Sequence, residues 1–294
     1  MLDAAVEVRN LNKRYRNGTW ANRDITLTVA RGELLAILGP NGAGKTTLVR
    51  QITTELLPTS GEIRVFGLDA VSRPNQVKAR MGVIPQETNF YWGLSVRQHL
   101  RIFGKLRGLP PRIASRRAAE LVSDLGLEEH SDKPGEQLSG GLRRRLLVGI
   151  AVLADPDLLV LDEPSVGLDP ESRRDLWDLL RSYRRRGATV LLTTHSMEEA
   201  EALCDRVGII HEGALLALDT IANLRAAHGF DYKISFVADG RPQILYGASD
   251  TALVQQVQAK GIREFAVSKT NLEDVYLGLT DGKGRLNEGP PTDA

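Results

Sequence analysis

The chain has 294 residues, of which 42% are hydrophobic and 26% are charged, and its formal net charge is +1. This length suits one large or two modest domains with a substantial core. The balanced charge excludes a general electrostatic attraction to nucleic acid or to an anionic membrane, and the single cysteine excludes an internal disulfide.

The first predicted elements are three strands and a helix. Apolar residues alternate with polar ones over residues 6–8 and 25–29, which predicts half-exposed strands, and the apolar run Leu34–Leu38 predicts a buried strand. The spacing of Leu48, Ile52 and Leu56 predicts a helix shortly after that run. The residues between them therefore connect a strand to a helix.

That connection carries a phosphate-binding pattern. Residues Gly39 to Thr47 read Gly-Pro-Asn-Gly-Ala-Gly-Lys-Thr-Thr and fit G-x-x-x-x-G-K-[ST]. Glycines let the backbone approach phosphate closely, and the N–H groups at a helix start attract its negative charge. We expect Lys45 to reach the β- and γ-phosphates and the Thr46 hydroxyl to bind Mg²⁺. The pattern predicts a site for a nucleoside triphosphate.

The middle of the chain reads as helical. Residues 95–130 carry helical patterns that a Pro-Pro pair interrupts, and we interpret about residues 90–155 as an inserted helical subdomain. Arginine is dense at residues 112–117, 143–145 and 181–186. We interpret these runs as solvated helix faces rather than as binding patches.

Two short apolar strands follow, and each leads into polar residues. Leu158–Leu161 is followed by Asp162 and Glu163, and Val190–Thr194 is followed by His195. Runs of this kind are buried in parallel sheets. Strands that alternate with helices around a phosphate loop predict an α/β domain with a parallel core sheet.

The polar residues near these strands have predicted local conformations. Glu163 precedes a proline, which predicts an extended backbone, and its carboxylate could orient and deprotonate an attacking water. Asp169 is expected to cap the helix that follows it. Ser196 and Glu199 predict a capping box that fixes His195 beside a helix start.

The periodic pattern weakens near residue 220. Cys204 is spaced with Ala200, Leu203 and Val207 as on the buried face of a helix. Beyond it, the sequence predicts strands at 232–237, 244–246 and 262–267 and helices at 251–260 and 272–279. We therefore predict a first domain over 1–220, a small C-terminal α+β appendage over 221–281 and a disordered tail over 282–294.

One motif restricts the families of phosphate-loop proteins to which this chain could belong to a single one. Leu138-Ser139-Gly140-Gly141 opens a predicted helix and resembles the signature motif of the ATP-binding cassette (ABC) ATPases. Other family elements occur in the family's order across about residues 4–220: an aromatic at Tyr15, a Q-loop at Gln86, a Walker B strand ending at Asp162 and Glu163, a D-loop at Gly167-Leu168-Asp169, and a switch histidine at His195. The resemblance implies a P-loop NTPase cassette with a parallel core sheet, an antiparallel N-terminal β subdomain and an inserted helical subdomain.

The resemblance also implies the ligands, the activity and the site residues. ATP and Mg²⁺ are the implied ligands, and hydrolysis of ATP to ADP and phosphate is the implied activity. Mg²⁺ would be held by Thr46, Gln86 and Asp162. Glu163 is the expected general base, with Lys45, His195 and Gln86 completing the catalytic set. The residues implied to contact the nucleotide are Tyr15, Gly39, Pro40, Asn41, Gly42, Ala43, Gly44, Lys45, Thr46, Thr47, Gln86, Ser139, Gly140, Gly141 and Asp169.

The signature serine implies a second copy of the chain. Ser139 at a helix N-terminus offers a hydroxyl and N–H groups to an anion. In the family, two copies pair head to tail, so that the serine of one copy caps the γ-phosphate held by the other. The family usually has glutamine where this chain has Leu142, and Leu142 cannot make that residue's hydrogen bond to the nucleotide across the interface.

The implied function is ATP-driven transport through a separate membrane permease. A non-glutamine residue followed by Arg143-Arg144-Arg145, together with the segment 271–276, resembles the drug, antibiotic, polysaccharide and nodulation-factor exporter ATPases. The longest apolar stretch, 146–154, is about half of what a spanning helix needs, and the N-terminus has no signal-peptide pattern. We expect a cytoplasmic protein, peripheral on the cytoplasmic face of the membrane. By resemblance it docks through residues 87–106, where Phe90, Tyr91 and Trp92 cluster and could receive a helix of the permease. Local core packing is the alternative role of these three aromatic residues.

Two other classes of function stand as alternatives. A soluble ABC ATPase that acts on ribosomes or in DNA repair usually carries two cassettes or a long coiled coil. This chain shows one cassette and no sustained heptads, so we expect no nucleic-acid partner. A nucleoside-monophosphate kinase would leave the Ser139 motif and His195 without a role.

Overall fold

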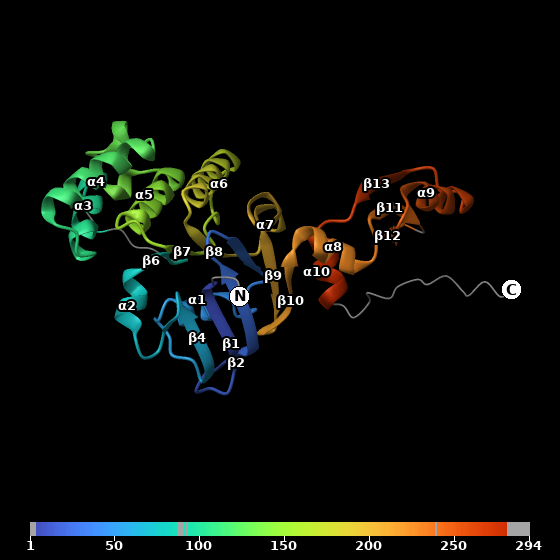
Figure 1. Cartoon of the computed structure of the whole chain (residues 1–294). Helices are drawn as coiled ribbons and strands as arrows, with labels where there is room; N and C mark the ends of the chain where they lie inside the picture. The colour runs from blue at the N-terminus through green and yellow to red at the C-terminus, as the bar shows by residue number, and fades with distance from the viewer. Residues whose placement is uncertain (1–3, 87–90, 92, 239, 281–294) are drawn as a thin grey trace. The chain divides into compact units, whose positions relative to one another are not determined.

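The computed structural model describes residues 4–86, 91, 93–238 and 240–280 (Figure 1). The chain divides into two compact units, residues 1–215 and 216–294. The tail expected over 282–294, and Phe90 and Trp92 of the expected docking segment, lie outside the described residues.

An antiparallel sheet opens the first unit. Its strand order is β2-β1-β4-β5, formed by β1 (Ala4–Arg14), β2 (Trp20–Ala30), β4 (Ser60–Val65) and β5 (Leu68–Asp69). Val6 pairs with Val29 and Val8 with Leu27, and all four side chains are buried, which confirms the predicted alternation. The antiparallel N-terminal β subdomain is therefore confirmed.

The second sheet of this unit holds the core. Its order is β10-β9-β3-β8-β7-β6, formed by β3 (Leu34–Leu38), β6 (Met81–Ile84), β7 (Leu158–Asp162), β8 (Thr189–Thr194), β9 (Arg206–His211) and β10 (Ala214–Thr220), which crosses the boundary between the units. β3 pairs in parallel with β8 and β9, and β7 in parallel with β6 and β8. All residues of β3, β7 and β8 are buried. Because these strands are parallel, the residues that follow them meet at one edge of the sheet.

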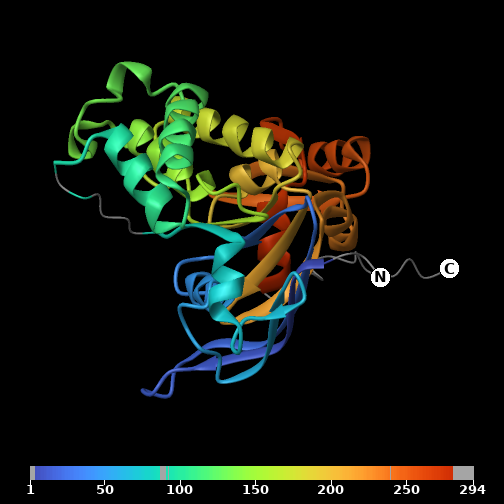
Figure 2. The same cartoon turned by 60° about the vertical axis from the view of Figure 1, so that its left-hand side comes forward.

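α-Helices complete the described part of this unit. They are α1 (Lys45–Ile52), α2 (Pro74–Ala79), α3 (Val96–Leu106), α4 (Pro111–Asp124), α5 (Gly140–Val152) and α6 (Pro170–Arg185), followed by α7 (Met197–Leu203). Helices α3, α4 and α5 lie side by side in both views (Figures 1 and 2). Glycines allow the close packing, since a Cβ at Gly104 would crowd Ala114 and one at Gly149 would crowd Leu125. This group is the helical subdomain that the sequence predicted.

Two predicted helix boundaries were wrong. α1 ends at Ile52, so Leu56 lies outside it, and α7 ends at Leu203, so Val207 lies in β9 instead of on a helix face. The second error has a tertiary cause. The Asp205 N–H donates to the Leu34 carbonyl oxygen at 2.8 Å, and the Leu34 N–H donates to Asp205 Oδ2 at 2.9 Å. These bonds draw the chain into the core sheet immediately after Cys204.

The second unit is a small α+β structure, as the sequence predicted. Its antiparallel sheet has the order β12-β11-β13, formed by β11 (Tyr232–Ala238), β12 (Arg241–Gly247) and β13 (Phe265–Lys269). α9 (Asp250–Ala259) covers one face, where Leu253 and Val257 pack against Ile234 and Phe236. α8 (Ile221–His228), which the sequence pattern did not reveal, packs with α10 (Leu272–Thr280). In the part of the chain that the structure describes, no helix combines the length and apolarity needed to span a membrane.

Candidate active site

The phosphate loop lies between β3 and α1. Gly42 and Gly44 have φ values of +81° and +102°, in the left-handed region that favours glycine. A Cβ at Gly44 would overlap the carbonyl oxygen of Ala21, so this position has no room for another residue. Lys45 Nζ donates to the carbonyl oxygens of Gly39 at 2.7 Å and Pro40 at 3.1 Å. The loop therefore curls around its own lysine.

A hollow of about 350 Å³ opens beside this loop. It brings together residues that are distant in sequence and that the sequence predicted for one site, including Tyr15, Gln86 and Glu163. Its complete lining is Tyr15, Thr19, Trp20, Ala21, Pro40, Asn41, Gly42, Ala43, Gly44, Lys45, Thr46, Thr47, Gln86 and Glu163. The sequence reasoning missed the residues from Thr19 to Ala21. Their position at the turn that follows Tyr15 is the signal that would have indicated them.

Tyr15 lies at the exposed side of the hollow. Its hydroxyl is 3.2 Å from Thr47 Oγ1, and Lys13 Nζ lies 5.7 Å from the centre of its ring. The contact with Thr47 ties the tyrosine to the phosphate loop. An aromatic ring at this position can stack on a flat heterocycle whose phosphates occupy the loop.

Glu163 occupies the centre of the site and is only 4% exposed. Its Oε1 lies 3.0 Å from Lys45 Nζ, and its Oε2 lies 2.8 Å from His195 Nδ1. The predicted extended backbone was wrong, since φ of Glu163 is +49°. The physical reason is that its N–H is held by both the carbonyl oxygen and the hydroxyl of Thr193, at 3.1 and 3.0 Å. The following proline disfavours only the right-handed helical region.

Asp162 is the last residue of β7, directly before Glu163 in the sequence, and is 2% exposed. Its Oδ1 accepts a hydrogen bond from the hydroxyl of Thr193. A single threonine therefore orients Asp162 and fixes the main chain of Glu163. The sequence reasoning did not single out Thr193; a polar residue within a buried apolar strand was the available signal.

His195 follows β8, and its environment differs in one respect from the prediction. Ser196 caps α7 by accepting from the Glu199 N–H at 3.2 Å, as predicted. The Glu199 side chain does not complete the capping box; it is fully buried, and its Oε1 accepts from Trp177 Nε1 at 3.1 Å. The His195 side chain is 52% exposed, so it can meet a ligand while bonded to Glu163.

The signature residues lie outside this hollow. Ser139 caps α5, and its hydroxyl accepts from the Leu142 N–H at 3.3 Å. A Cβ on Gly141 would overlap the Ser172 hydroxyl, and Asp169 caps α6 by accepting from the Ser172 N–H at 2.9 Å. Hydrogen bonds from Ser172 lower the pKa of Asp169 below its ordinary value. The signature and the D-loop are thus neighbours, but within one copy they do not line the phosphate site.

One arginine of the predicted solvated run is buried. Arg144 is 9% exposed, whereas Arg143 is exposed and Arg145 is half-buried. The solvated-face interpretation was therefore wrong for Arg144. Its guanidinium donates hydrogen bonds to the carbonyl oxygens of Glu163 and Pro164. The spacing of residues along one helix cannot reveal partners on another segment.

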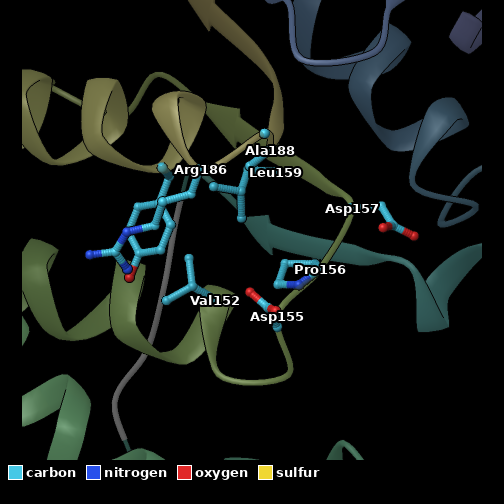
Figure 3. Close-up of a pocket in the computed structure, with 9 residues that line it drawn as sticks. Val152, Asp155, Pro156, Asp157, Leu159, Arg186 and Ala188 are labelled. Carbon is cyan, nitrogen blue, oxygen red and sulfur yellow. The ribbon is translucent and has the colours of Figure 1, made fainter.

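Another hollow, of about 140 Å³, lies where β7 and β8 begin (Figure 3). Glu163 is at the other end of β7, where that strand ends. No residue predicted for the site lines this hollow. Burial raises the pKa of Tyr183, one of its walls, to about 12. Its lining is Val152, Asp155, Pro156, Asp157, Leu159, Tyr183, Arg186, Gly187 and Ala188.

The fold and this site define a P-loop ATPase of the cassette type. Comparisons with known proteins agree: the model of the ABC transporter family matches residues 22–166. The daunorubicin/doxorubicin resistance ATP-binding protein DrrA of Streptomyces peucetius is 42% identical over 94% of this chain and 92% of its own length. The chain belongs to the ABC transporter family as an ATP-binding subunit, and its activity is ATP hydrolysis.

Further relatives support the same assignment. The Nod factor export ATP-binding protein I of Burkholderia lata is 42% identical over 94% of this chain and 97% of its own length. A solved ATP-binding subunit of an ABC transporter is 31% identical, with a TM-score of 0.70, over 76% of this chain and 93% of its own. The cbiO1 structure from Clostridium perfringens, described as part of the ABC transporter complex cbiONQ, is 25% identical with a TM-score of 0.70, over 88% and 96% of the two chains. These relatives are transporter proteins, which favours the transport interpretation over the ribosome or DNA-repair alternative.

Proposed function

We propose that this chain is the ATP-hydrolysing subunit of an exporter and works on the cytoplasmic face of the membrane with a separate permease. The names of the DrrA and Nod factor relatives support export, and cbiO1 is part of a complex. The cassette would occupy residues 1–220 and an accessory domain residues 221–281. ATP-driven pairing and hydrolysis would power the permease.

The observation that carries the catalytic proposal is the buried carboxylate of Glu163, held between Lys45 and His195 beside the phosphate loop. In the proposed step, a water attacks the γ-phosphorus, its proton passes to the Glu163 carboxylate, and ADP leaves. Lys45 would exchange its carbonyl partners for phosphate oxygens. His195 would donate to the γ-phosphate and stabilise its developing charge.

Thr46, Gln86 and Asp162 are the residues that would hold Mg²⁺. Thr46 and Gln86 line the hollow. Asp162 is not among its lining residues; it directly precedes Glu163, which is, and the Thr193 hydroxyl orients its carboxylate. A hydroxyl, an amide and one carboxylate fit an ion that keeps waters and takes phosphate oxygens as further ligands. When bound, Mg²⁺ would neutralise charge on the β- and γ-phosphates.

We further propose that a second copy completes the site. Ser139, Gly140 and Gly141 lie at the N-terminus of α5, where N–H groups favour an anion, yet they do not line the hollow of their own chain. A head-to-tail pair would place Ser139 of each copy on the γ-phosphate of the other. Asp169, beside the signature, would lie at the same interface.

The permease is proposed to dock on residues 87–106. Of the described part of this segment, Tyr91 is 58% exposed with its ring centre 5.9 Å from that of Phe103, and Leu106 on α3 is also exposed. Exposed apolar side chains of this kind can receive a helix of a partner chain.

Turnover of Glu163→Gln tests the catalytic proposal. We expect kcat to fall by about two orders of magnitude or more while ATP binding persists, because the amide keeps the shape of the side chain but cannot accept the proton of the attacking water. Glu198→Gln is the matched control, since Glu198 is an exposed neighbour paired with Arg173 at 3.4 Å. Wild-type turnover of Glu163→Gln would remove Glu163 from the role of general base.

A further inference from the structure

Arg144 connects the signature helix to the loop that carries Glu163. It lies in the second turn of α5, the helix that begins at Ser139. Its Nη2 donates to the carbonyl oxygen of Glu163 at 2.7 Å, and its Nε donates to the carbonyl oxygen of Pro164. The guanidinium thereby bridges two successive peptide carbonyls of the catalytic loop.

This arginine is a buried cation with compensating charges. Burial lowers the pKa of Arg144, and the carboxylates of Glu199 and Asp162 oppose that effect. A guanidinium stays protonated under these conditions, so both hydrogen bonds are charge-assisted. Its two hydrogen bonds go to main-chain carbonyl oxygens and not to a carboxylate, so Arg144 fixes the backbone of this loop.

The loop that Arg144 contacts has an unusual backbone. Glu163 has φ of +49°, a conformation that a residue with a side chain adopts only when its surroundings impose it. Thr193 holds the N–H of Glu163, and Arg144 holds its carbonyl oxygen. The peptide groups on both sides of the Glu163 Cα are therefore fixed, and the direction of its side chain follows from them.

We propose that Arg144 is a positioning residue for ATP hydrolysis: its two hydrogen bonds to the Glu163–Pro164 carbonyls aim the Glu163 carboxylate at the attacking water. This inference rests on the proposed role of Glu163 as general base. It also gives the signature helix a direct mechanical connection to the catalytic carboxylate of its own chain.

A double-mutant cycle in the full-length chain tests this role. Arg144→Met keeps the length of the side chain and removes every donor, and Arg144→Lys restores one donor. We expect Arg144→Met to lower kcat about ten-fold or more with KM for ATP changed less than about two-fold, and Arg144→Lys to recover part of the loss. Arg145→Met is the matched control on the same helix; it loses contacts to Asp175 and to the Leu125 carbonyl oxygen, and its kcat should stay within about two-fold of wild type.

The second arm of the cycle is measured in the Glu163→Gln background by single-turnover hydrolysis of labelled ATP. If Arg144 acts through Glu163, Arg144→Met should reduce the residual rate by less than about two-fold there. The same fractional loss in both backgrounds, or a loss that appears in KM instead of kcat, would overturn the proposal. If Arg144→Met does not fold, the cycle is run with Arg144→Lys, whose kcat must fall only when Glu163 is present.

The cycle also separates this inference from the function on which it rests. Wild-type turnover in Glu163→Gln would refute the proposed role of Glu163 as general base. Loss of turnover in Glu163→Gln with full turnover in Arg144→Met refutes the positioning role of Arg144 alone.

Discussion

Thr193→Val removes a single hydroxyl from the core sheet while preserving the shape of the side chain. Two hydrogen bonds are lost: the one donated to Asp162 Oδ1, and the one accepted from the Glu163 N–H at 3.0 Å. The second loss is small, because the same N–H also donates to the Thr193 carbonyl oxygen at 3.1 Å. The first loss leaves a buried carboxylate without this donor.

The expected loss of stability is therefore set by the hydrogen bond to Asp162. A hydrogen bond to a charged group contributes about 1.5–3 kcal/mol, so we expect Thr193→Val to destabilise the first unit by about 2 kcal/mol. Since Asp162 loses its orientation next to the proposed Mg²⁺ position, kcat should fall by about ten-fold. Thr189→Val is the control on the same strand: its hydroxyl accepts from the Gly32 N–H at 3.0 Å, and the loss of this neutral bond should cost about 1 kcal/mol. Turnover should be unchanged in that variant.

Urea unfolding followed by tryptophan fluorescence measures the stability of the first unit selectively. The three tryptophans, Trp20, Trp92 and Trp177, all belong to it. Steady-state ATP hydrolysis measures the catalytic effect. Equal destabilisation by Thr193→Val and Thr189→Val, together with equal turnover, would show that the Thr193 hydroxyl neither stabilises Asp162 nor orients it.

Two further predictions concern the phosphate loop and the second unit. Lys45→Ala should weaken ATP binding in calorimetry by roughly a hundred-fold, because a cation that faces phosphate contributes about 3 kcal/mol; retained affinity would contradict the proposed contact. Burial and the hydrogen bond to Asp274 raise the pKa of Tyr246 from 10.0 to about 12. The neutral phenol therefore stabilises the folded second unit fully below pH 10, and this stabilisation is lost as the pH rises through about 12. Tyr246→Phe should remove this pH dependence and one phenol that titrates near pH 12 in ultraviolet absorbance; a titration unchanged from wild type would refute the assignment.

The parts of the fold that could be predicted are those whose cause is local. Leu34–Leu38 and Leu158–Leu161 are apolar at every position because both faces of their strands are buried, and such runs identify parallel core strands. The phosphate loop could also be predicted from its sequence pattern, because Gly44 occupies a position where no Cβ fits and glycine is therefore required.

The features that escaped prediction depend on contacts between distant segments. Arg144 is buried because two carbonyl oxygens near residue 163 accept from it, and no property of the arginine run itself indicates this. The left-handed backbone of Glu163 depends on Thr193, 30 residues away in sequence. α7 stops short of its expected end because Asp205 bonds to Leu34 in the neighbouring strand. In each case a tertiary hydrogen bond overrides a local preference.

The oligomeric state of Glu163→Gln, measured by size-exclusion chromatography with light scattering with and without ATP, tests the central claim most directly. The claim is that a phosphate site built around Lys45 and Glu163 is completed by Ser139 of a second copy. Because the variant should bind ATP without hydrolysing it, we expect a monomer without nucleotide and a dimer with ATP. A monomer that binds ATP without pairing would contradict the claim.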